Sequence, residues 1–202
     1  LDSGVSVNSV DGPEAVALHG KAVLKTSCVF GGKFFSEEAK IIAPRDLPRA
    51  KCAARKDTII ISRMNTPALV GECGYVDRDF PDLFLPDRLW ITSHDNEELR
   101  SVRWLAGLLS HRAFNIAIKE TATGTSSSMK NISKDSFLAV CVPLPPGEEQ
   151  LAIADVLSDL DEDIGAVENR LAKTRHIKTA LMQQLLTGRT RLPLDKYTTN
   201  DA

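Results

Sequence analysis

The residues most able to do chemistry are scattered along this chain, at spacings that no common catalytic mechanism uses. The histidines fall in four unrelated contexts: His19, His94, His111 and His176. The cysteines form no CxxC pair and have no matching histidine cluster that would hold zinc: Cys28, Cys52, Cys73 and Cys141. The chain also lacks a GxxxxGK phosphate loop, a GxGxxG turn and a GxSxG nucleophile elbow. Glu38-Ala39-Lys40 has the acid-x-Lys form of some nucleases, but no further acid is clearly placed to share its metal. The sequence therefore predicts a non-catalytic binding protein, without a metal or another cofactor.

Basic residues are concentrated in one turn-rich segment, residues 40–56. This segment carries a single acid, Asp46, against six bases, which are Lys40, Arg45, Arg49, Lys51, Arg55 and Lys56. One interpretation is a solvated loop whose charges answer acids elsewhere in the chain. The other is a positively charged binding surface. The formal net charge of −2 does not exclude it, because net charge says nothing about local patches.

A second group of polar residues follows a strand-like run. Residues 57–63, DTIIISR, are a continuous β-branched run between polar residues, which is typical of a buried strand. The next four residues, MNTP, form a turn signal that would present Arg63, Asn65 and Thr66 at the end of the strand. Recognition side chains gather at such strand ends and loops.

The rest of the chain before position 147 predicts a mixed, β-rich globular domain of the α+β class. Further short strands are expected at residues 15–18, 22–25, 40–43, 69–76, 83–92 and 137–142. Residues 97–120 show helical spacing, with one apolar face made of Leu99, Val102, Leu105, Leu108 or Leu109, and Ile116. The hydroxyl-rich residues 124–133 are expected to form a loop, and the prolines of residues 143–146 a stiff linker.

Residues 147–188 are the longest segment without a proline, and their apolar residues repeat at helical spacing. Nine of them form a heptad seam: Ile153, Leu157, Leu160, Ile164, Val167, Leu171, Ile177, Leu181 and Leu185. The repeat slips after Leu171, which changes the local winding without ending the helix. Glu148 and Glu149 suit a helix start, and Gly188 suits a left-handed cap at its end. At about 1.5 Å per residue, the predicted helix is a rod of roughly 60 Å.

The charges of this helix are segregated along its length. Residues 148–168 carry eight acids and no base, whereas residues 170–178 carry four bases and no acid. Two antiparallel copies would place the acidic half of each beside the basic half of the other. Each exposed pair contributes only ~0.3–0.5 kcal/mol, so charge selects the orientation and the apolar seam supplies the affinity. We therefore expect an antiparallel coiled coil with a second copy or with a missing half of the protein. The alternative is a rod packed on its own domain, whose charges merely complement the helix dipole.

The C-terminal quarter of the chain resembles a known family. The run VPLPPGEEQLAIADVLSDLDEDIGAVENRLAKTRHIKTALMQQLLTGRTRL is similar to the conserved helical region of specificity (S) subunits of type I restriction-modification enzymes. Its diagnostic pieces are the PLPPGEEQLAIA opening and the LMQQLLTG closing. Upstream, SRMNTPALVG, LFLPDRL and GTSSSMKNIS look like pieces of a target-recognition domain of the same family. The resemblance covers most of the chain, and its helical part is the more specific.

The resemblance implies DNA recognition without catalysis. Such subunits hold two target-recognition domains, each reading one half of a bipartite DNA site, and antiparallel conserved helices set the distance between them. They dock adenine methyltransferase (M) subunits, which the restriction (R) subunits join. This chain has one recognition domain and one helical region, so we expect a fragment, or a half-subunit whose homodimer reads a palindromic site. The alternative is an assembly scaffold, derived from a half-subunit, that no longer binds DNA.

On this resemblance, several residues are expected to contact double-stranded DNA. The phosphate contacts are assigned to the basic segment: Lys40, Arg45, Arg49, Lys51 and Arg55. Base reading requires forked or amide side chains, so Arg63 and Asn65 are expected to read bases. Lys33, in a glycine-aromatic turn, and Lys130, in the 124–133 loop, are further candidates. Residues 125–128 form, in the alternative, an internal turn bonded to its own backbone.

These expectations divide the chain into a target-recognition domain at residues 1–146, a spacer and dimerisation helix at residues 147–188, and a flexible tail at residues 189–202. A hydrophobic content of 43% and a charged content of 26% are ordinary for a globular protein. No apolar run approaches the ~18–20 residues of a membrane span, and the start lacks signal-peptide character. Scattered cysteines suit a reducing cytosol. We therefore expect a cytoplasmic protein without a membrane partner.

Overall fold

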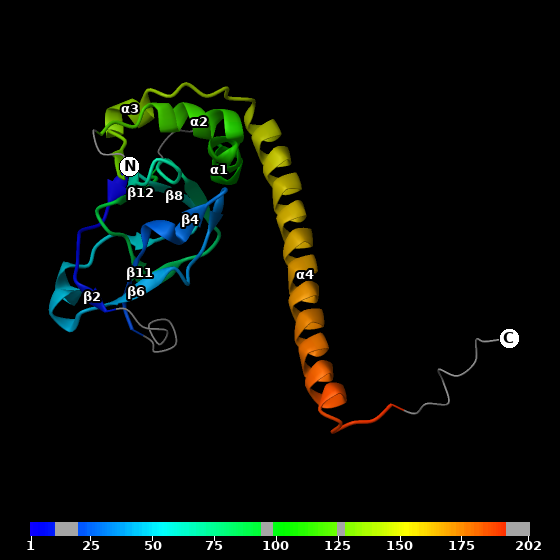
Figure 1. Cartoon of the computed structure of the whole chain (residues 1–202). Coiled ribbons are helices and arrows are strands. Elements are labelled where there is room, and N and C mark those ends of the chain that lie inside the picture. The colour runs from blue at the N-terminus through cyan, green and yellow to red at the C-terminus, as the bar shows by residue number, and fades with distance from the viewer. Residues whose placement is uncertain (11–19, 94–98, 125–127, 193–202) are drawn as a thin grey trace. The chain divides into compact units, whose positions relative to one another are not determined.

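The structure is a computed structural model that describes residues 1–10, 20–93, 99–124 and 128–192 (Figure 1). Its residues group into two units, Leu1–Asp155 and Val156–Ala202, and the division falls inside the long helix α4 (Gly147–Leu186). The first unit mixes short strands with helices, and the second is most of α4 with the residues that follow it. The prediction of a mixed, β-rich part followed by a long C-terminal helix is confirmed.

The run of isoleucines forms the central strand of a four-stranded antiparallel sheet. In spatial order, its strands are β1 (Asp2–Ser3), β12 (Leu89–Ile91), β8 (Thr58–Ser62) and β10 (Cys73–Val76). Successive side chains of a strand point to opposite faces. Ile60 accordingly belongs to one apolar cluster, and Ile59 and Ile61 belong to another. Burial on both faces explains why this run is continuous and does not alternate with polar residues.

A second sheet lies on one side of the first. In spatial order, its strands are β2 (Ser9–Val10), β6 (Ala39–Ile42), β3 (Ala22–Leu24), β11 (Phe80–Phe84) and β7 (Ala53–Ala54). The pair β3–β11 is parallel, and the other pairs are antiparallel. Leu24 and Ala54 of this sheet share one buried cluster with Ile60 and Leu89 of the first sheet. That cluster is therefore the core between the two sheets.

Helices α1 (Val102–Ser110) and α2 (Arg112–Glu120) cover the other face of the first sheet (Figure 1). Their residues Leu109 and Ile118 are buried in the second cluster, together with Ile59 and Ile61. The first unit thus has three layers, which are helices, the first sheet and the second sheet. The predicted strands at residues 22–25, 40–43, 57–63, 69–76 and 83–92 overlap β3, β6, β8, β10, and β11 with β12. The predicted strand at residues 15–18 lies outside the described residues.

The prediction of one continuous helix over residues 97–120 is wrong in the described part, because the chain breaks at His111. The backbone of His111 is extended (φ −62°, ψ 138°), and its Nδ1 accepts a hydrogen bond from the N–H of Ala113 at 3.4 Å. An N-terminal cap therefore begins a second helix at Arg112. The break also turns Ile116 outward, where it is 45% exposed instead of facing the core.

The prediction of a last strand at residues 137–142 is also wrong. Phe137 lies in a short helix, α3 (Lys134–Leu138), and no residue from 139 to 146 is in a helix or strand. The helix begins because the Ser133 hydroxyl accepts the N–H of Ser136 at 3.0 Å. The apolar residues Val140 and Val142 face a pocket beside α1 and pair with no strand.

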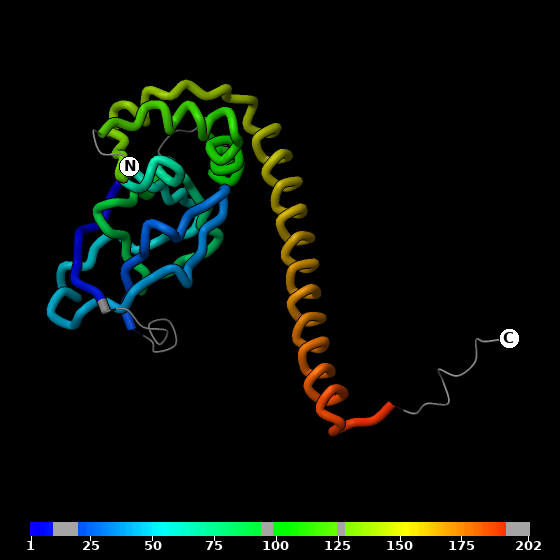
Figure 2. The backbone as a smooth tube through the Cα atoms, in the orientation of Figure 1, coloured from blue at the N-terminus to red at the C-terminus, as the bar shows by residue number. Residues whose placement is uncertain are grey.

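Helix α4 begins at Gly147 as predicted and ends at Leu186, two residues before the predicted end. Gly188 adopts φ +71°, the left-handed conformation expected of a helix cap, and its N–H donates to the Leu185 carbonyl at 3.2 Å. The backbone tube in Figure 2 runs through α4 without interruption. Within the described residues, no helix is both apolar enough and long enough for a bilayer crossing.

The first turn of α4 is held to the first unit by Gln150, which is fully buried. Its side-chain oxygen accepts the backbone N–H groups of Arg100 at 3.0 Å and Ser101 at 3.4 Å. Its side-chain nitrogen donates to the Pro145 carbonyl at 2.9 Å. A single amide therefore joins the helix, the proline linker and the segment that leads into α1.

Candidate nucleic-acid interface

The basic segment is divided among three structural elements. Lys40 is half-buried on β6, whereas Arg45 and Arg49 lie exposed on the 3-10 helix η2 (Pro44–Arg49). Lys51 and Arg55 are exposed on either side of β7. The segment therefore offers exposed cations at several points along the chain from β6 to β7, and such cations suit contacts with phosphates.

The single acid of this segment proves to be structural. Asp46 is 5% exposed, and its carboxylate accepts the backbone N–H of Asn8 at 2.6 Å and the Asn8 side-chain amide at 2.7 Å. Arg49 lies 3.3 Å from the other carboxylate oxygen. The Asn8 backbone hydrogen bond, with help from the Asn8 amide and Arg49, holds the pKa of Asp46 below its usual value. The charge of Arg49 is thus partly neutralised by Asp46, three residues before it on the same 3-10 helix.

Arg63 and Lys130 lie at the short strand pair of β9 (Met64–Asn65) and β13 (Lys130–Asn131), in the first unit. These two strands pair antiparallel, with Lys130 opposite Asn65, and the N–H of Ile132 donates to the Arg63 carbonyl at 2.9 Å. The Arg63 guanidinium lies 5.6 Å from the centroid of the Trp90 ring, close enough for a cation–π contact. The predictions of a turn at residues 64–67 and a loop at residues 124–133 missed the β9–β13 pairing, because two-residue strands have no periodicity.

Two polar atoms in this corner remain unsatisfied. Arg63 Nε and Asn131 Oδ1 are buried and have no hydrogen-bond partner within the described residues. Both side chains line a pocket of about 390 Å³, together with Trp90 and Lys134. A donor and an acceptor without a partner among the described residues therefore line the same pocket, and Arg63 remains a candidate for contact with DNA.

Asn65, predicted to read bases, is committed to the fold. It is 9% exposed, and its side-chain nitrogen donates to Ser62 Oγ at 3.1 Å and to the Thr26 carbonyl at 3.4 Å. Its side-chain oxygen accepts the N–H of Thr66 at 2.9 Å. Since both ends of the amide are used inside the protein, we correct that expectation and assign Asn65 to holding the turn.

The two candidate lysines outside the basic segment, Lys33 and Lys130, differ in exposure and in hydrogen bonding. Lys130 is half-buried, and its ammonium donates to the Gly124 carbonyl at 2.7 Å, which ties down one side of its loop. Lys33 is exposed at the end of a hairpin formed by β4 (Val29–Phe30) and β5 (Lys33–Phe34). Lys33 is therefore the better placed of the two for a partner outside the chain.

An ion pair that the sequence did not reveal lies beneath this hairpin. Glu72 is 7% exposed, and its carboxylate accepts the Gly31 N–H at 2.9 Å and the Lys119 ammonium at 2.8 Å. Glu72 and Lys119 are 47 positions apart, and no pattern in the sequence connects them. The glycine pair between aromatic residues was the one visible signal that this stretch is special.

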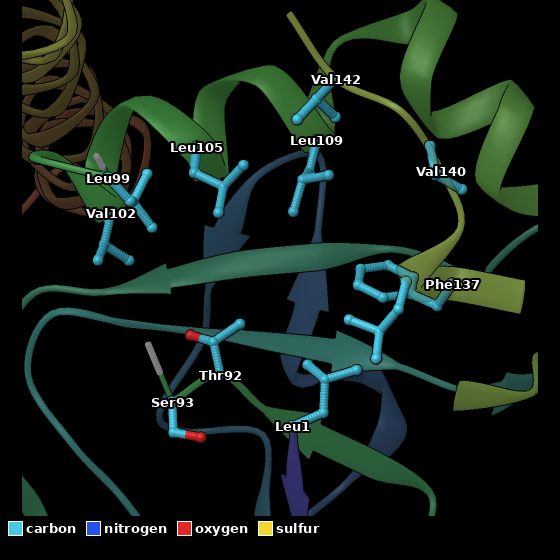
Figure 3. Close-up of a pocket in the computed structure, with 11 residues that line it drawn as sticks. Leu1, Thr92, Ser93, Leu99, Val102, Leu105, Leu109, Phe137, Val140 and Val142 are labelled. Carbon is cyan, nitrogen blue, oxygen red and sulfur yellow. The ribbon is translucent and has the colours of Figure 1, made fainter. Parts of the chain in front are cut away.

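The first unit also contains an apolar pocket of about 220 Å³. Figure 3 shows Val102, Leu105 and Leu109 pointing from α1 toward Leu1 and Phe137. Its lining suits hydrophobic contact and offers little for acid–base chemistry. Burial raises the pKa of the nearby core thiol, Cys73, to about 12, so this cysteine stays protonated. Among the described residues, no three histidine, cysteine or acidic side chains gather as a metal site.

Comparison with known proteins gives these features a context. The sequence model of the type I restriction modification DNA specificity domain matches residues 41–174. The chain is 22% identical over 163 residues to the type I restriction enzyme EcoEI specificity subunit of Escherichia coli, covering 81% of this chain and 27% of that protein. Over 70 residues it is 34% identical to the MjaVIII specificity subunit of Methanocaldococcus jannaschii, covering 35% of this chain and 16% of that protein. The chain therefore spans less than a third of these relatives.

Two solved structures share the fold. The HsdS subunit of Thermoanaerobacter tengcongensis superposes with a TM-score of 0.53 at 20% identity, over 94% of this chain and 49% of that one. A type I restriction-modification S subunit from M. genitalium gives a TM-score of 0.55 at 16% identity, over 91% and 47% of the two chains. At these identities the likeness concerns the fold, and this chain spans about half of either structure.

Proposed function

This chain belongs to the family of type I restriction modification DNA specificity domains, and we propose that it recognises a specific double-stranded DNA sequence without catalysing a reaction itself. The observation that carries the proposal is the extent of the family match. It runs from β6 in the second sheet to Thr174 in the second half of α4, and so covers elements of both units. In this assignment the chain directs adenine methyltransferase subunits, and through them restriction subunits, to the DNA site in the cytoplasm.

We assign DNA contact to the part predicted as a recognition domain, residues 1–146. The exposed cations of η2 and of the residues flanking β7, Arg45, Lys51 and Arg55, would hold phosphates and fix the register of the protein on the duplex. Arg63 is the remaining base-reading candidate, because its Nε has no partner among the described residues. Lys40 and Arg49 contribute less in this assignment, since Lys40 is half-buried and Arg49 is paired with Asp46.

We assign assembly to α4. Seven apolar residues of its seam or beside it are between 46% and 67% exposed, which is unusual for residues that gain by burial: Val156, Leu160, Ile164, Val167, Leu171, Ile177 and Leu181. A partner helix would bury them, and the segregated charges favour an antiparallel partner. A second copy, or the other half of a longer subunit, meets both requirements. A rod of roughly 60 Å is long enough to separate two half-sites one DNA turn apart, ~34 Å.

Methylation mapping tests the proposed function directly. Genome-wide adenine methylation is compared in cells with and without the gene, and we expect one sequence motif to lose its methylation in the deletion strain. Arg63→Ala should reduce methylation of that motif, whereas Arg49→Ala, a surface cation already paired with Asp46, should leave it close to wild type. An unchanged methylation pattern in the deletion strain would contradict the proposal.

An assembly scaffold without DNA binding is the second candidate function. The exposed seam of α4 and the internal use of Asn65 and Lys130 favour it. The two candidates differ in their response to charge reversal at Arg45, Lys51 and Arg55. A DNA-reading subunit loses DNA binding and keeps its methyltransferase partner after these substitutions, whereas a scaffold has no DNA binding to lose.

A further inference from the structure

The β4–β5 hairpin presents an aromatic side chain to solvent. Phe30 is 57% exposed, and it is the one aromatic residue among the exposed large hydrophobic side chains of the described residues. A single exposed apolar residue is common on protein surfaces and would mean little alone. The construction of the hairpin around Phe30 is what makes its exposure informative.

The hairpin separates its side chains by direction. Val29 pairs with Phe34, and Phe30 pairs with Lys33, across a two-residue turn. Both turn residues are glycines with positive φ, +57° at Gly31 and +82° at Gly32, as the tightest hairpin turns require. Val29 lies in the core between the sheets, with Phe34 packed against it, so the paired side chains of Phe30 and Lys33 point to the opposite face. An aromatic ring and an ammonium group therefore stand next to each other, directed outward.

The tip of the hairpin is fixed in place by a buried acid. One Glu72 oxygen accepts the Gly31 N–H at 2.9 Å, and the other accepts the Lys119 ammonium at 2.8 Å. Burying a carboxylate costs several kcal/mol unless its partners are well placed. Here both oxygens are used, so the negative charge is satisfied by one backbone N–H at the tip and one lysine on α2.

A close approach to β10 fixes the second side of the hairpin. A Cβ at Gly74 would lie 2.5 Å from the Lys33 carbonyl oxygen and 2.9 Å from the Phe34 nitrogen, so the hairpin backbone rests directly on this glycine. The N–H of Tyr75 donates to the Gly32 carbonyl at 3.3 Å. The tip is therefore held from two directions, although it makes a turn of only two residues.

We propose that this hairpin is a DNA-reading element, in which Phe30 makes an apolar contact with a base edge and Lys33 contacts a neighbouring phosphate. The proposal rests on the proposed function and names a specificity-determining residue for it. Rigid presentation keeps the entropic cost of binding low, since neither the turn nor the strand pair has to become ordered. Phenylalanine recognises the methyl group of thymine in the major groove, and lysine supplies a point charge for a phosphate. A β-ribbon is also narrow enough to enter that groove.

The test compares two substitutions at the tip with one control. The full chain, in complex with its methyltransferase subunits, is titrated at several salt concentrations with two duplexes. One holds the site found by methylation mapping, and the other holds the same bases in shuffled order. The variants are Phe30→Ala, Lys33→Ala and Ile116→Ala, the last being an exposed apolar residue on α2 that belongs to neither strand of the hairpin. Thermal unfolding verifies that each variant is folded.

Each variant has its own expected result. Phe30→Ala should reduce the preference for the specific duplex about 10-fold and leave the salt dependence unchanged, as the loss of one base contact would. Lys33→Ala should weaken binding to both duplexes equally and reduce the slope of log K against log salt by about 1. Ile116→Ala should match the wild type in both measurements. Replacing thymine by uracil in the site should abolish the difference between wild type and Phe30→Ala.

Other outcomes overturn the inference in distinguishable ways. A wild-type complex that binds both duplexes equally contradicts the proposed function itself. If the wild-type complex prefers the specific duplex and the folded Phe30→Ala variant shows the same preference, the hairpin assignment alone is contradicted. If that variant instead loses its methyltransferase subunits, the hairpin contacts a protein and not DNA.

Discussion

The two units of this chain place their apolar residues in opposite ways. In the first unit the strands and α1 direct isoleucine, leucine and tryptophan inward, and Ile59, Ile60 and Ile61 have no exposed surface. In the second unit the apolar residues of α4 lie along its outside, with Leu160 53% and Leu171 49% exposed. The first unit therefore holds a core of its own, whereas the second exposes an apolar surface, which we propose is covered by another chain. On this proposal, the same apolar residue types specify folding in one region and association in the other.

The largest effect on stability is expected from a substitution that creates a cavity in the core of the first unit. Ile60→Ala should lower the free energy of unfolding by about 4 kcal/mol, because Ile60 is fully buried between the two sheets. Leu160→Ala is the matched change in α4 and should cost the first unit less than about 0.5 kcal/mol. Urea denaturation followed by tryptophan fluorescence measures both, since Trp90 and Trp104 lie in the first unit. Equal losses for the two variants would remove the distinction between the units.

A somewhat smaller effect is expected from the ion pair beneath the hairpin. Lys119→Met keeps most of the side-chain volume but leaves the Glu72 carboxylate buried without its cation. The expected loss is about 3 kcal/mol, measured by the same denaturation assay. The double variant Lys119→Met with Glu72→Gln should recover part of it, because the buried negative charge is then removed. If the free energy of unfolding falls by no more than the ~1 kcal/mol of an exposed ion pair, the Glu72 carboxylate does not depend on Lys119 in the way described.

The third effect concerns the join between α4 and the first unit. Gln150→Ala removes the acceptor for the Arg100 and Ser101 N–H groups and should cost about 2 kcal/mol. Gln150→Glu keeps the acceptor oxygen but replaces the side-chain nitrogen, which donates to the Pro145 carbonyl, with a second oxygen. We expect it to cost a comparable amount. Amide hydrogen exchange at Arg100 and Ser101 reports the loss locally, and unchanged protection there would contradict the assignment.

The smallest effect on the first unit, and the largest on association, is expected in the seam of α4. Leu160→Asp or Leu171→Asp should leave the unfolding of the first unit within about 0.5 kcal/mol of wild type. Light scattering should show the molecular mass falling from that of an associated species to that of the single chain. Asn169→Asp changes a polar position of the same helix and serves as the control. A wild-type chain that is already monomeric, without its partner subunits, would point to a different chain as the occupant of the seam.

Local sequence patterns were sufficient to predict the elements whose secondary structure is specified by their own residues. Strand β8 and helix α4 follow from a continuous β-branched run and from a heptad repeat, and both were placed within two residues. The break at His111 was missed because histidine seldom caps a helix, so its extended backbone has no strong sequence signal. The run at residues 137–142 looked like a strand, but an apolar run becomes a strand when another strand pairs with it, and none does here.

The candidate interface was less predictable, because it depends on contacts between distant positions. Asn65 looked available for base reading until its hydrogen bond to Thr26, 39 positions away, was seen. The partner of Glu72 lies 47 positions further along the chain, and Asp46 is fixed by Asn8, 38 positions before it. The basic segment was recognisable from composition, but which of its cations are paired was not. The assignments of individual DNA contacts remain predictions that the binding experiments test.

The alternation of side chains along the β4–β5 hairpin has an evolutionary consequence. Val29 and Phe34 pack in the core beneath the hairpin, while the outward positions 30 and 33 lie outside that buried cluster. If these two positions contact DNA as proposed, selection can act on them for a new DNA site with little effect on the packing beneath the hairpin. A library randomised at these two positions would be a compact starting point for engineering altered specificity.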